Sequence, residues 1–272
     1  MPTRNTRFFP CILSCLLFLL SLTGCDALPA VLNTGTSTPT SSSQSSLNVW
    51  TKAATGIEIR TEDWKSEGNN EDRITILRLD PRHIHLSIGY QPQFPLSLNE
   101  WMKQAHALAV INGGYFNDKN QPTGLLVANG QAHGASYQGF GGMLSVNAQG
   151  RLELRSLHDQ PYDSNNEQIQ QATQSSPMLV LNGQRTRFSA NAASERRTVV
   201  AQDKQGRLLL IVSPKEAFSL DELADLLVSS DLSIQTALNL DGGASTGMYV
   251  RAGNQNVTID SVTTLPIVII IK

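Results

Sequence analysis

The sequence predicts an α+β domain with a strongly twisted, largely antiparallel sheet and a few helices packed on it. Strand-like runs predominate along the chain, and two pairs of them are joined by the short Gly-containing turns NAQGR and DKQGR, which are typical of hairpins. Two further segments carry helix-capping patterns. A doubly wound parallel sheet is less favoured, because hairpins outnumber helix crossovers.

The expected strands are segments in which apolar residues alternate or follow one another without interruption. They cover residues 74–80, 83–90, 142–157, 178–183 and 197–213. The closing segment IVIIIK is also strand-like, and it is too short to span a bilayer. An apolar run of this length is typical of a buried central strand.

The two expected helices begin at serine residues. Ser97 precedes Glu100 by three positions, and Ser219 precedes Glu222 in the same way. In such a capping box the serine oxygen accepts from the N3 amide while the glutamate reaches back to the serine amide. The second helix would place its leucines on one apolar face.

The N-terminal residues have the pattern of an export signal. Arg4 and Arg7 precede an apolar run at 11–22, and Thr23-Gly24 are small residues before Cys25. The run is too short for a membrane-spanning helix. The sequence LTGC resembles the lipobox of bacterial lipoproteins, which implies cleavage before Cys25 and a lipid on its sulfur. The alternative is an ordinary secretory signal with a cysteine nearby.

The predicted organisation is a signal peptide at 1–24, a lipidated Cys25 with a Ser/Thr-rich tether at 25–49, and a domain at 50–272. The tether is mostly Ser and Thr and cannot bury enough apolar surface to offset the entropy of ordering. The protein is therefore expected to be exported to a bacterial cell envelope and anchored to a membrane through Cys25. The domain itself contains no cysteine, so disulfides and thiolate metal sites are excluded.

The net charge of the chain argues against nucleic acid as a partner. The chain has 272 residues, 40% of them hydrophobic, and a formal net charge of -2. There is no basic excess of the kind that nucleic-acid binding requires, so no nucleic-acid partner is expected.

The stretch INGGYFN has features of a binding site. Asn112 ends an apolar run, where a polar side chain needs hydrogen-bond partners or a ligand. Gly113 and Gly114 permit close approach of the backbone, and Tyr115 and Phe116 would form an apolar wall for a sugar ring. The stretch taken alone favours a simpler alternative, a Gly-Gly hairpin with two core aromatics.

The stretch NLDGGAST raises a similar choice. On a strand, Asn239 and Asp241 would point to one face while the flanking leucines point to the core. Gly242 and Gly243 follow. A type I′ turn and a reactive site are equally compatible with this stretch. No Lys-Ser/Thr pair completes a phosphate-binding P-loop, so a nucleotide site is not expected.

Arg197 opens a predicted strand after Glu195 and Arg196. A guanidinium fork matches the oxygens of a phosphate or a carboxylate. The alternative is a solvated charge cluster.

The motifs INGGYFN, PTGLLVANG, SSPMLVLNG, RRTVVAQDKQGRLLLIV, FSLDELADLL and TALNLDGGAS, in this order, resemble the phosphodiester glycosidase family. The resemblance covers residues 70–272 and implies hydrolysis of the sugar C1–O bond of a sugar-1-phosphodiester, with an N-acetylglucosamine-type or cell-wall polymer substrate. The family's site residues fall on Asn112 and the glycines after it, on Arg197, and on Asp241 with the two glycines that follow. Ala201 and Ala244 stand where the family commonly has glycine.

The resemblance suggests roles for these residues. Arg197 would bind the phosphodiester's charge, and Asp241 would act as a base on water or stabilise the sugar cation. Asn112 and the glycine amides would orient the substrate. Glu195, Asp118 and His133 are candidates for a second acid or base, and each is equally compatible with an ordinary surface position.

Two other functions remain open at this stage: a lipoprotein that binds a glycan without cleaving it, and a structural lipoprotein of the envelope. Asp241 and Asn239 also offer oxygen ligands suited to Ca²⁺ or Mg²⁺. No acidic cluster of the EF-hand type accompanies them, so no cofactor is predicted and a divalent metal is left open.

Overall fold

The computed structural model describes residues 47–189 and 193–272. The predicted signal peptide, Cys25 and nearly all of the tether lie outside these residues. Within them, no helix has the length and apolar character that a membrane crossing requires.

The fold is mostly β, which corrects the expected α+β class. Eighteen strands, two α-helices and one short 3-10 helix make up the described part of the chain. The two helices have eight and ten residues, too few to cover a sheet, so the sheets bury their apolar faces mainly against one another. Every paired strand is antiparallel to its partner, in agreement with the abundance of hairpins in the sequence.

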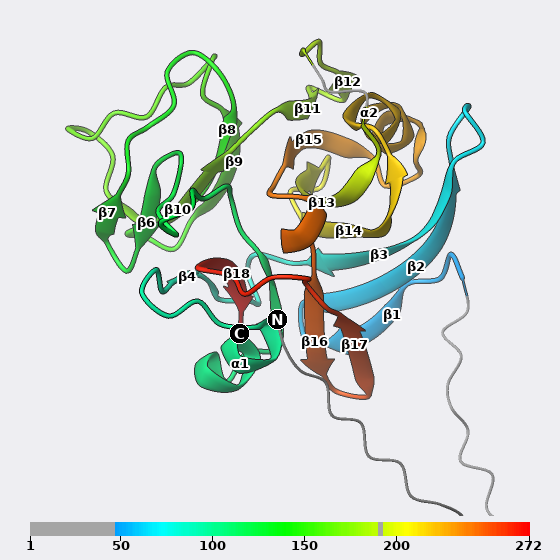
Figure 1. Ribbon diagram of the computed structural model, residues 1–272, viewed down its shortest axis with the longest axis horizontal. Coiled ribbons are helices and arrows are strands. Elements are labelled where there is room, and N and C mark those ends of the chain that lie inside the picture. Colours follow the sequence, from blue (N-terminus) through cyan, green and yellow to red (C-terminus); the bar gives the residue numbers. More distant parts are fainter. Residues whose placement is uncertain (1–46, 190–192) are drawn as a thin grey trace, which may run out of the picture. The chain divides into compact units, whose positions relative to one another are not determined.

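The strands form three sheets (Figure 1). The eight-stranded sheet has the order β1 (Thr51–Ala54), β2 (Ile57–Lys65), β3 (Glu71–Leu79), β14 (Leu208–Phe218), β13 (Glu195–Asp203), β15 (Ile234–Asn239), β11 (Met178–Leu181), β12 (Gln184–Arg185). The second sheet has the order β7 (Gln131–His133), β6 (Leu126–Ala128), β10 (Ile169–Ser175), β8 (Gly142–Asn147), β9 (Leu152–Ser156). The third has the order β17 (Gln255–Ile259), β16 (Met248–Ala252), β5 (Ala109–Asn112), β18 (Ile267–Ile271), β4 (Leu86–Tyr90).

Both predicted helices are present with their capping boxes. α1 (Leu98–Ala105) begins after Ser97, whose oxygen accepts from the Glu100 amide at 3.3 Å. α2 (Leu220–Ser229) begins after Ser219 in the same way, and it buries Leu223 and Leu227. The predicted closing strand is also confirmed, because β18 is fully buried between β5 and β4.

One hydrophobic core joins the three sheets. It contains Leu210 of the large sheet, Leu144 of the second and Ile269 of the third, all of them inaccessible to solvent or nearly so. Leu238 and Leu240 also belong to this core, as their alternation with polar residues predicts. The chain at the end of β15 is therefore anchored in the core by these two leucines. It leaves the large sheet there and meets the end of β5.

Candidate functional site

Asp241 lies where the large sheet meets the third sheet. Its backbone amide donates to the Gly113 carbonyl at 3.1 Å, and its own carbonyl accepts from Asn112 Nδ2 at 2.7 Å. The two glycine-containing motifs, far apart in sequence, are thus joined at their strand ends.

The carboxyl group of Asp241 titrates close to neutral pH. Burial raises its pKa from 3.8 to about 6, while hydrogen bonds from the Ser245 side chain and the Gly242 amide partly oppose the shift. The Gly242 amide donates to Oδ1 at 2.9 Å. A carboxyl group with this pKa exchanges a proton readily near pH 6 and 7, which is what general acid–base catalysis needs.

The buried side chain of Asn112 links the strands that form the site. Its side chain is 1% exposed, and Oδ1 accepts from Thr198 Oγ1 at 2.8 Å and from the Gly247 amide at 3.2 Å. With Nδ2 on the Asp241 carbonyl, its oxygen is bonded twice and its amino group once within the protein. Asn112 is therefore placed as a positioning residue that sets the backbone of Asp241. Thr198 was not identified from the sequence, where a threonine on an apolar strand carries no distinct signal.

The first glycine pair is required by close chain packing. A Cβ on Gly113 would stand 2.5 Å from Ile267 Cγ2, and a Cβ on Gly114 would stand 2.3 Å from the Gln174 carbonyl oxygen. The Gly113 amide donates to the Ile267 carbonyl, and the Gly114 amide donates to Thr173 Oγ1. Both amides are thus used within the protein, so the expected contact of these amides with substrate gains no support here.

Tyr115 and Asn239 form a polar pair beside Asp241. Asn239 Nδ2 donates to the Tyr115 hydroxyl at 2.7 Å and to the Ser176 carbonyl at 3.0 Å. Burial, and then the charge of Asp241, raises the pKa of Tyr115 to about 12. Asn239 Oδ1 is buried without a hydrogen-bond partner among the described residues. A buried unpaired oxygen is costly and marks a position where a ligand donor would be stabilising.

Phe116 is part of the hydrophobic core and not of the polar pair formed by Tyr115 and Asn239. It is partly buried, packs against two hydrophobic clusters of the core and forms an isolated bridge with Pro122. Its ring is a packing group, and the expected sugar wall at Phe116 has no support in this position.

Arg197 is buried close to the second glycine pair. It is 8% exposed, Nε donates to the Phe218 carbonyl at 3.0 Å, and Nη2 donates to the Ala193 carbonyl at 2.7 Å. Burial lowers its pKa, while Tyr115 and Glu195 raise it. In the described ranges, 47–189 and 193–272, no carboxylate lies within ion-pair distance of Arg197. A buried guanidinium without a paired carboxylate favours binding of an anion.

The second glycine pair brings Arg197 close to Asp241. A Cβ on Gly242 would stand 2.9 Å from the Arg196 carbonyl oxygen and 3.9 Å from Arg197 Nη1. Gly243 has a φ of +56°, in the left-handed region that favours glycine. Position 242 must therefore be a glycine for the turn to pack against the Arg196 carbonyl of β13, and Arg197 Nη1 lies beside it.

The three candidates for a second acid or base separate in space. Glu195 Oε2 lies 3.5 Å from the position of a Cβ on Gly243, so this carboxylate borders the site. Asp118 is exposed in the turn after Phe116. His133 lies on β7 with its ring centroid 4.6 Å from that of Tyr90.

An aromatic pair that the sequence did not reveal also borders the site. The Tyr137 hydroxyl lies 2.7 Å from Thr123 Oγ1, and the Thr123 amide donates to the Tyr115 carbonyl at 3.0 Å, which places Tyr137 near Tyr115. Burial raises the pKa of Tyr137, the hydrogen bond with Thr123 opposes the shift, and the charge of Asp241 adds to it. The Tyr137 ring stacks on Phe140 with centroids 4.7 Å apart, and Phe140 is 52% exposed. The available signal was two aromatics set among the glycines of the loop at 134–142.

The donor set around Asp241 is poor in metal ligands. In the part of the chain that the structure describes, no three His, Cys, Asp or Glu side chains are grouped as a metal site. Asp241 and Asn239 would supply one carboxylate and one amide oxygen.

Comparisons with known proteins identify the family. The model of the phosphodiester glycosidase family matches residues 105–271. A search of curated proteins gives no match.

Several solved structures share the fold. The catalytic domain of zebrafish N-acetylglucosamine-1-phosphodiester alpha-N-acetylglucosaminidase, auto-inhibited by its pro-peptide, is 19% identical, with a TM-score of 0.61 over 81% of this chain and 86% of that one. A hypothetical protein from Synechocystis is 16% identical, with a TM-score of 0.54 over 80% of this chain and 62% of that one. A protein from Burkholderia pseudomallei K96243 is 12% identical, with a TM-score of 0.53 over 75% and 74%. The family match, which spans both glycine motifs and Arg197, shows that this chain belongs to the phosphodiester glycosidase family.

Proposed function

We propose that this protein hydrolyses the bond between the anomeric carbon of a sugar and the phosphate oxygen of a sugar-1-phosphodiester. The observation that carries the proposal is that a buried guanidinium, Arg197, lies beside Gly242, the residue that follows Asp241, whose carboxyl group has a pKa of about 6. The zebrafish relative's name supports an N-acetylglucosamine-type sugar as the first substrate to test.

Arg197 is assigned to the phosphate. The transition state is oxocarbenium-like, and negative charge grows on the phosphate oxygen as the C1–O bond breaks. Of the three guanidinium nitrogens, Nε and Nη2 are held by the Phe218 and Ala193 carbonyls, which orients Nη1 toward the Gly242 turn. A fixed cation at that point stabilises the charge that develops during the reaction.

Asp241 is assigned to the water. At pH 7 a carboxyl group with a pKa of about 6 is mostly ionised and accepts a proton from the attacking water. The water oxygen forms the new bond to C1, and the electron pair of the broken bond leaves with the phosphomonoester. Because a phosphate monoester is a good leaving group, the mechanism does not depend on a strong general acid.

The remaining contacts are assigned to the sugar. Tyr137 and Phe140 offer a stacked aromatic face at the rim of the site. Asn239 Oδ1 offers a buried acceptor for a sugar hydroxyl. Asn112 acts through the Asp241 backbone.

We also propose that the protein works from a membrane surface. The LTGC sequence supports export and lipidation at Cys25, and the Ser/Thr-rich residues after it support a tether. A glycan-phosphate polymer of the cell envelope is then the accessible form of the substrate.

Hydrolysis in water labelled with heavy oxygen tests the proposed bond. We expect the label in the released sugar, because water attacks C1, and unlabelled phosphomonoester. Asp241→Asn should lower the rate by about a hundredfold or more, whereas Asp118→Asn, on an exposed turn, should not. Label in the phosphate would contradict the glycosidase assignment, and binding without product would favour a glycan-binding lipoprotein.

A further inference from the structure

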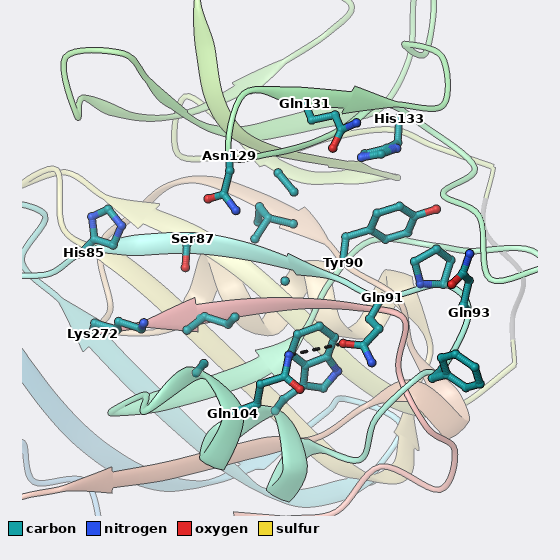
Figure 2. Close-up of a pocket in the computed structure, with 18 residues that line it drawn as sticks. His85, Ser87, Tyr90, Gln91, Gln93, Gln104, Asn129, Gln131, His133 and Lys272 are labelled. Atoms are coloured by element: carbon teal, nitrogen blue, oxygen red, sulfur yellow. Dashed lines mark hydrogen bonds between the residues drawn. The ribbon is translucent and has the colours of Figure 1, made fainter.

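A hollow separate from Asp241 and Arg197 lies beside edge strand β4 of the third sheet. It has a volume of about 830 Å³ and runs along edge strand β4, between α1 on one side and the β6–β7 hairpin on the other (Figure 2). Neither Asp241 nor Arg197 lines it. We call it the β4 groove.

Carboxamides, which both donate and accept hydrogen bonds, are the commonest polar side chains that line the β4 groove. Its carboxamides are Gln91, Gln93, Gln104, Asn129 and Gln131, and no aspartate or glutamate side chain lines it. A carboxamide matches a hydroxyl group, which also donates and accepts, whereas a carboxylate only accepts and an ammonium group only donates. His85 and Lys272 lie together at one end, away from Tyr90 and Gln93 (Figure 2).

Two of the five carboxamides and the Tyr90 hydroxyl are free to bind a ligand. The side chains of Gln93, Gln131 and the Tyr90 hydroxyl make no hydrogen bond to the described residues. Gln104 Nε2 donates to Gln91 Oε1 at a long 3.4 Å, and Asn129 Oδ1 accepts from Gln171 Nε2 at 2.9 Å.

Aromatic rings complete the same end of the groove. Phe94 is 73% exposed between two prolines, and the Tyr90 ring is tilted against the His133 ring with centroids 4.6 Å apart. Flat apolar rings among convergent polar groups are the usual composition of a small-ligand pocket.

The side chain of Gln171, on β10, prevents β4 from pairing with another strand. Gln171 Oε1 accepts from the Ile88 amide at 2.9 Å, and Gln171 Nε2 donates to Asn129 Oδ1 at 2.9 Å. The outward amide in the middle of β4 is therefore occupied, so an added peptide strand could not extend the sheet there.

The groove begins near the proposed catalytic site. β4 and β5 both pair with β18 and run parallel to each other. Tyr90 and Gly113 both lie opposite Ile267, at the same end of their strands, about 10 Å apart across two strand spacings. Asn120, in the turn that follows Phe116, donates to the Pro92 carbonyl at 3.0 Å and ties the two regions together.

We infer that the β4 groove is a second glycan-binding site, which takes an uncharged chain of hydroxyl-rich sugars. Its carboxamides bind the hydroxyl groups and Phe94 and Tyr90 pack against the sugar rings. Binding there is independent of hydrolysis, and it would retain a polymer on the protein between cleavage events.

Calorimetric titration of the full chain tests this site separately from catalysis. The protein carries Asp241→Asn so that no ligand is cleaved, and the probes are short oligomers of N-acetylglucosamine, of glucose and of galacturonate. We expect one of the uncharged oligomers to bind, and Phe94→Ala to weaken its binding by about fivefold or more. The double variant Gln93→Ala/Gln131→Ala should weaken it further, and Val228→Ala, an exposed apolar residue on α2, should not.

Several results would overturn the inference. These are binding that Phe94→Ala leaves unchanged, stronger binding of galacturonate than of the uncharged oligomers, or no binding of any oligomer. Thermal unfolding of each variant checks that the fold is retained, which the 73% exposure of Phe94 favours. Failure of hydrolysis by the unmutated protein would leave the binding result intact and would count only against the proposed reaction.

Discussion

At the scale of single residues, the site contains a carboxyl group whose environment opposes its charge. The folded state raises the pKa of Asp241 from 3.8 to about 6, so folding favours the protonated form. Stability that comes from this proton is fully present below about pH 4 and is lost as the pH rises through 6. At neutral pH the ionised group costs up to about 3 kcal/mol of stability. Asp241→Asn should therefore stabilise the fold while it removes the proposed base.

The pH dependence of catalysis follows from the same pKa. If ionised Asp241 accepts the proton from water, kcat/KM should rise about tenfold per pH unit below pH 6 and level off above it. Initial rates on a soluble sugar-1-phosphodiester between pH 4 and 9 measure this. A rate that falls as the pH rises through 6 would instead assign Asp241 the role of an acid.

Arg197 can be tested by a change that keeps its charge. Arg197→Lys removes the fork and the two bonds that orient it, so kcat/KM should fall by about a hundredfold. Arg196→Lys is the matched control, because Arg196 is bonded to the Pro214 and Asp260 carbonyls and should lose little activity. Equal rates for the two variants would argue against phosphate binding at Arg197.

At the scale of elements, the glycine pair Gly113–Gly114 has a different role from the one that the sequence predicts. The glycines after Asn112 were expected to admit a substrate. They admit other parts of the protein, because Gly113 lies against β18 and Gly114 against β10. A glycine pair in a sequence indicates that another group packs closely against the backbone, but it does not identify whether that group is a substrate or another part of the protein.

Gly114→Ala should therefore destabilise the protein. The added Cβ would stand 2.3 Å from a backbone oxygen, and the overpacking should cost about 2 kcal/mol or more in the free energy of unfolding. Gly68→Ala is the control, since its Cβ would meet no backbone atom but only the ends of polar side chains, the nearest being Glu222 Oε1 at 3.0 Å. Urea denaturation compares the two, and similar midpoints would show that β10 can move away without cost.

Helices and hairpins that are specified by a few neighbouring residues could be predicted from the sequence. Capping boxes located both helices, and the Gly-containing turns located two hairpins. The strand at 57–65 was not predicted, because Arg60 and Glu62 interrupt its apolar pattern. These two side chains are nevertheless buried, since they pair with each other at 2.6 Å.

At the scale of the whole molecule, Trp50, near the first described residues, lies against two arginines of the large sheet. The Trp50 ring lies 3.7 Å from Arg78 Cζ and 5.5 Å from Arg60 Cζ. Trp50→Ala should lower the free energy of unfolding by about 1 to 3 kcal/mol through lost packing and cation–π contact. Val49→Ala, with half of the Val49 side chain exposed, should have little effect. An unchanged unfolding midpoint for Trp50→Ala would place the start of the stable fold after this residue.

The sequence by itself determined the local elements, the predicted export signal with Cys25, and the three motifs that carry Asn112, Arg197 and Asp241. Only the tertiary structure decided how those motifs meet. Antiparallel pairing over long separations sets the number of sheets, brings Asp241 against Gly113, and buries Arg197 without a paired carboxylate among the described residues. Desolvation of a charge depends on what surrounds it after folding, so neither the raised pKa of Asp241 nor the burial of the Arg197 guanidinium could be inferred from the neighbours of these residues in sequence.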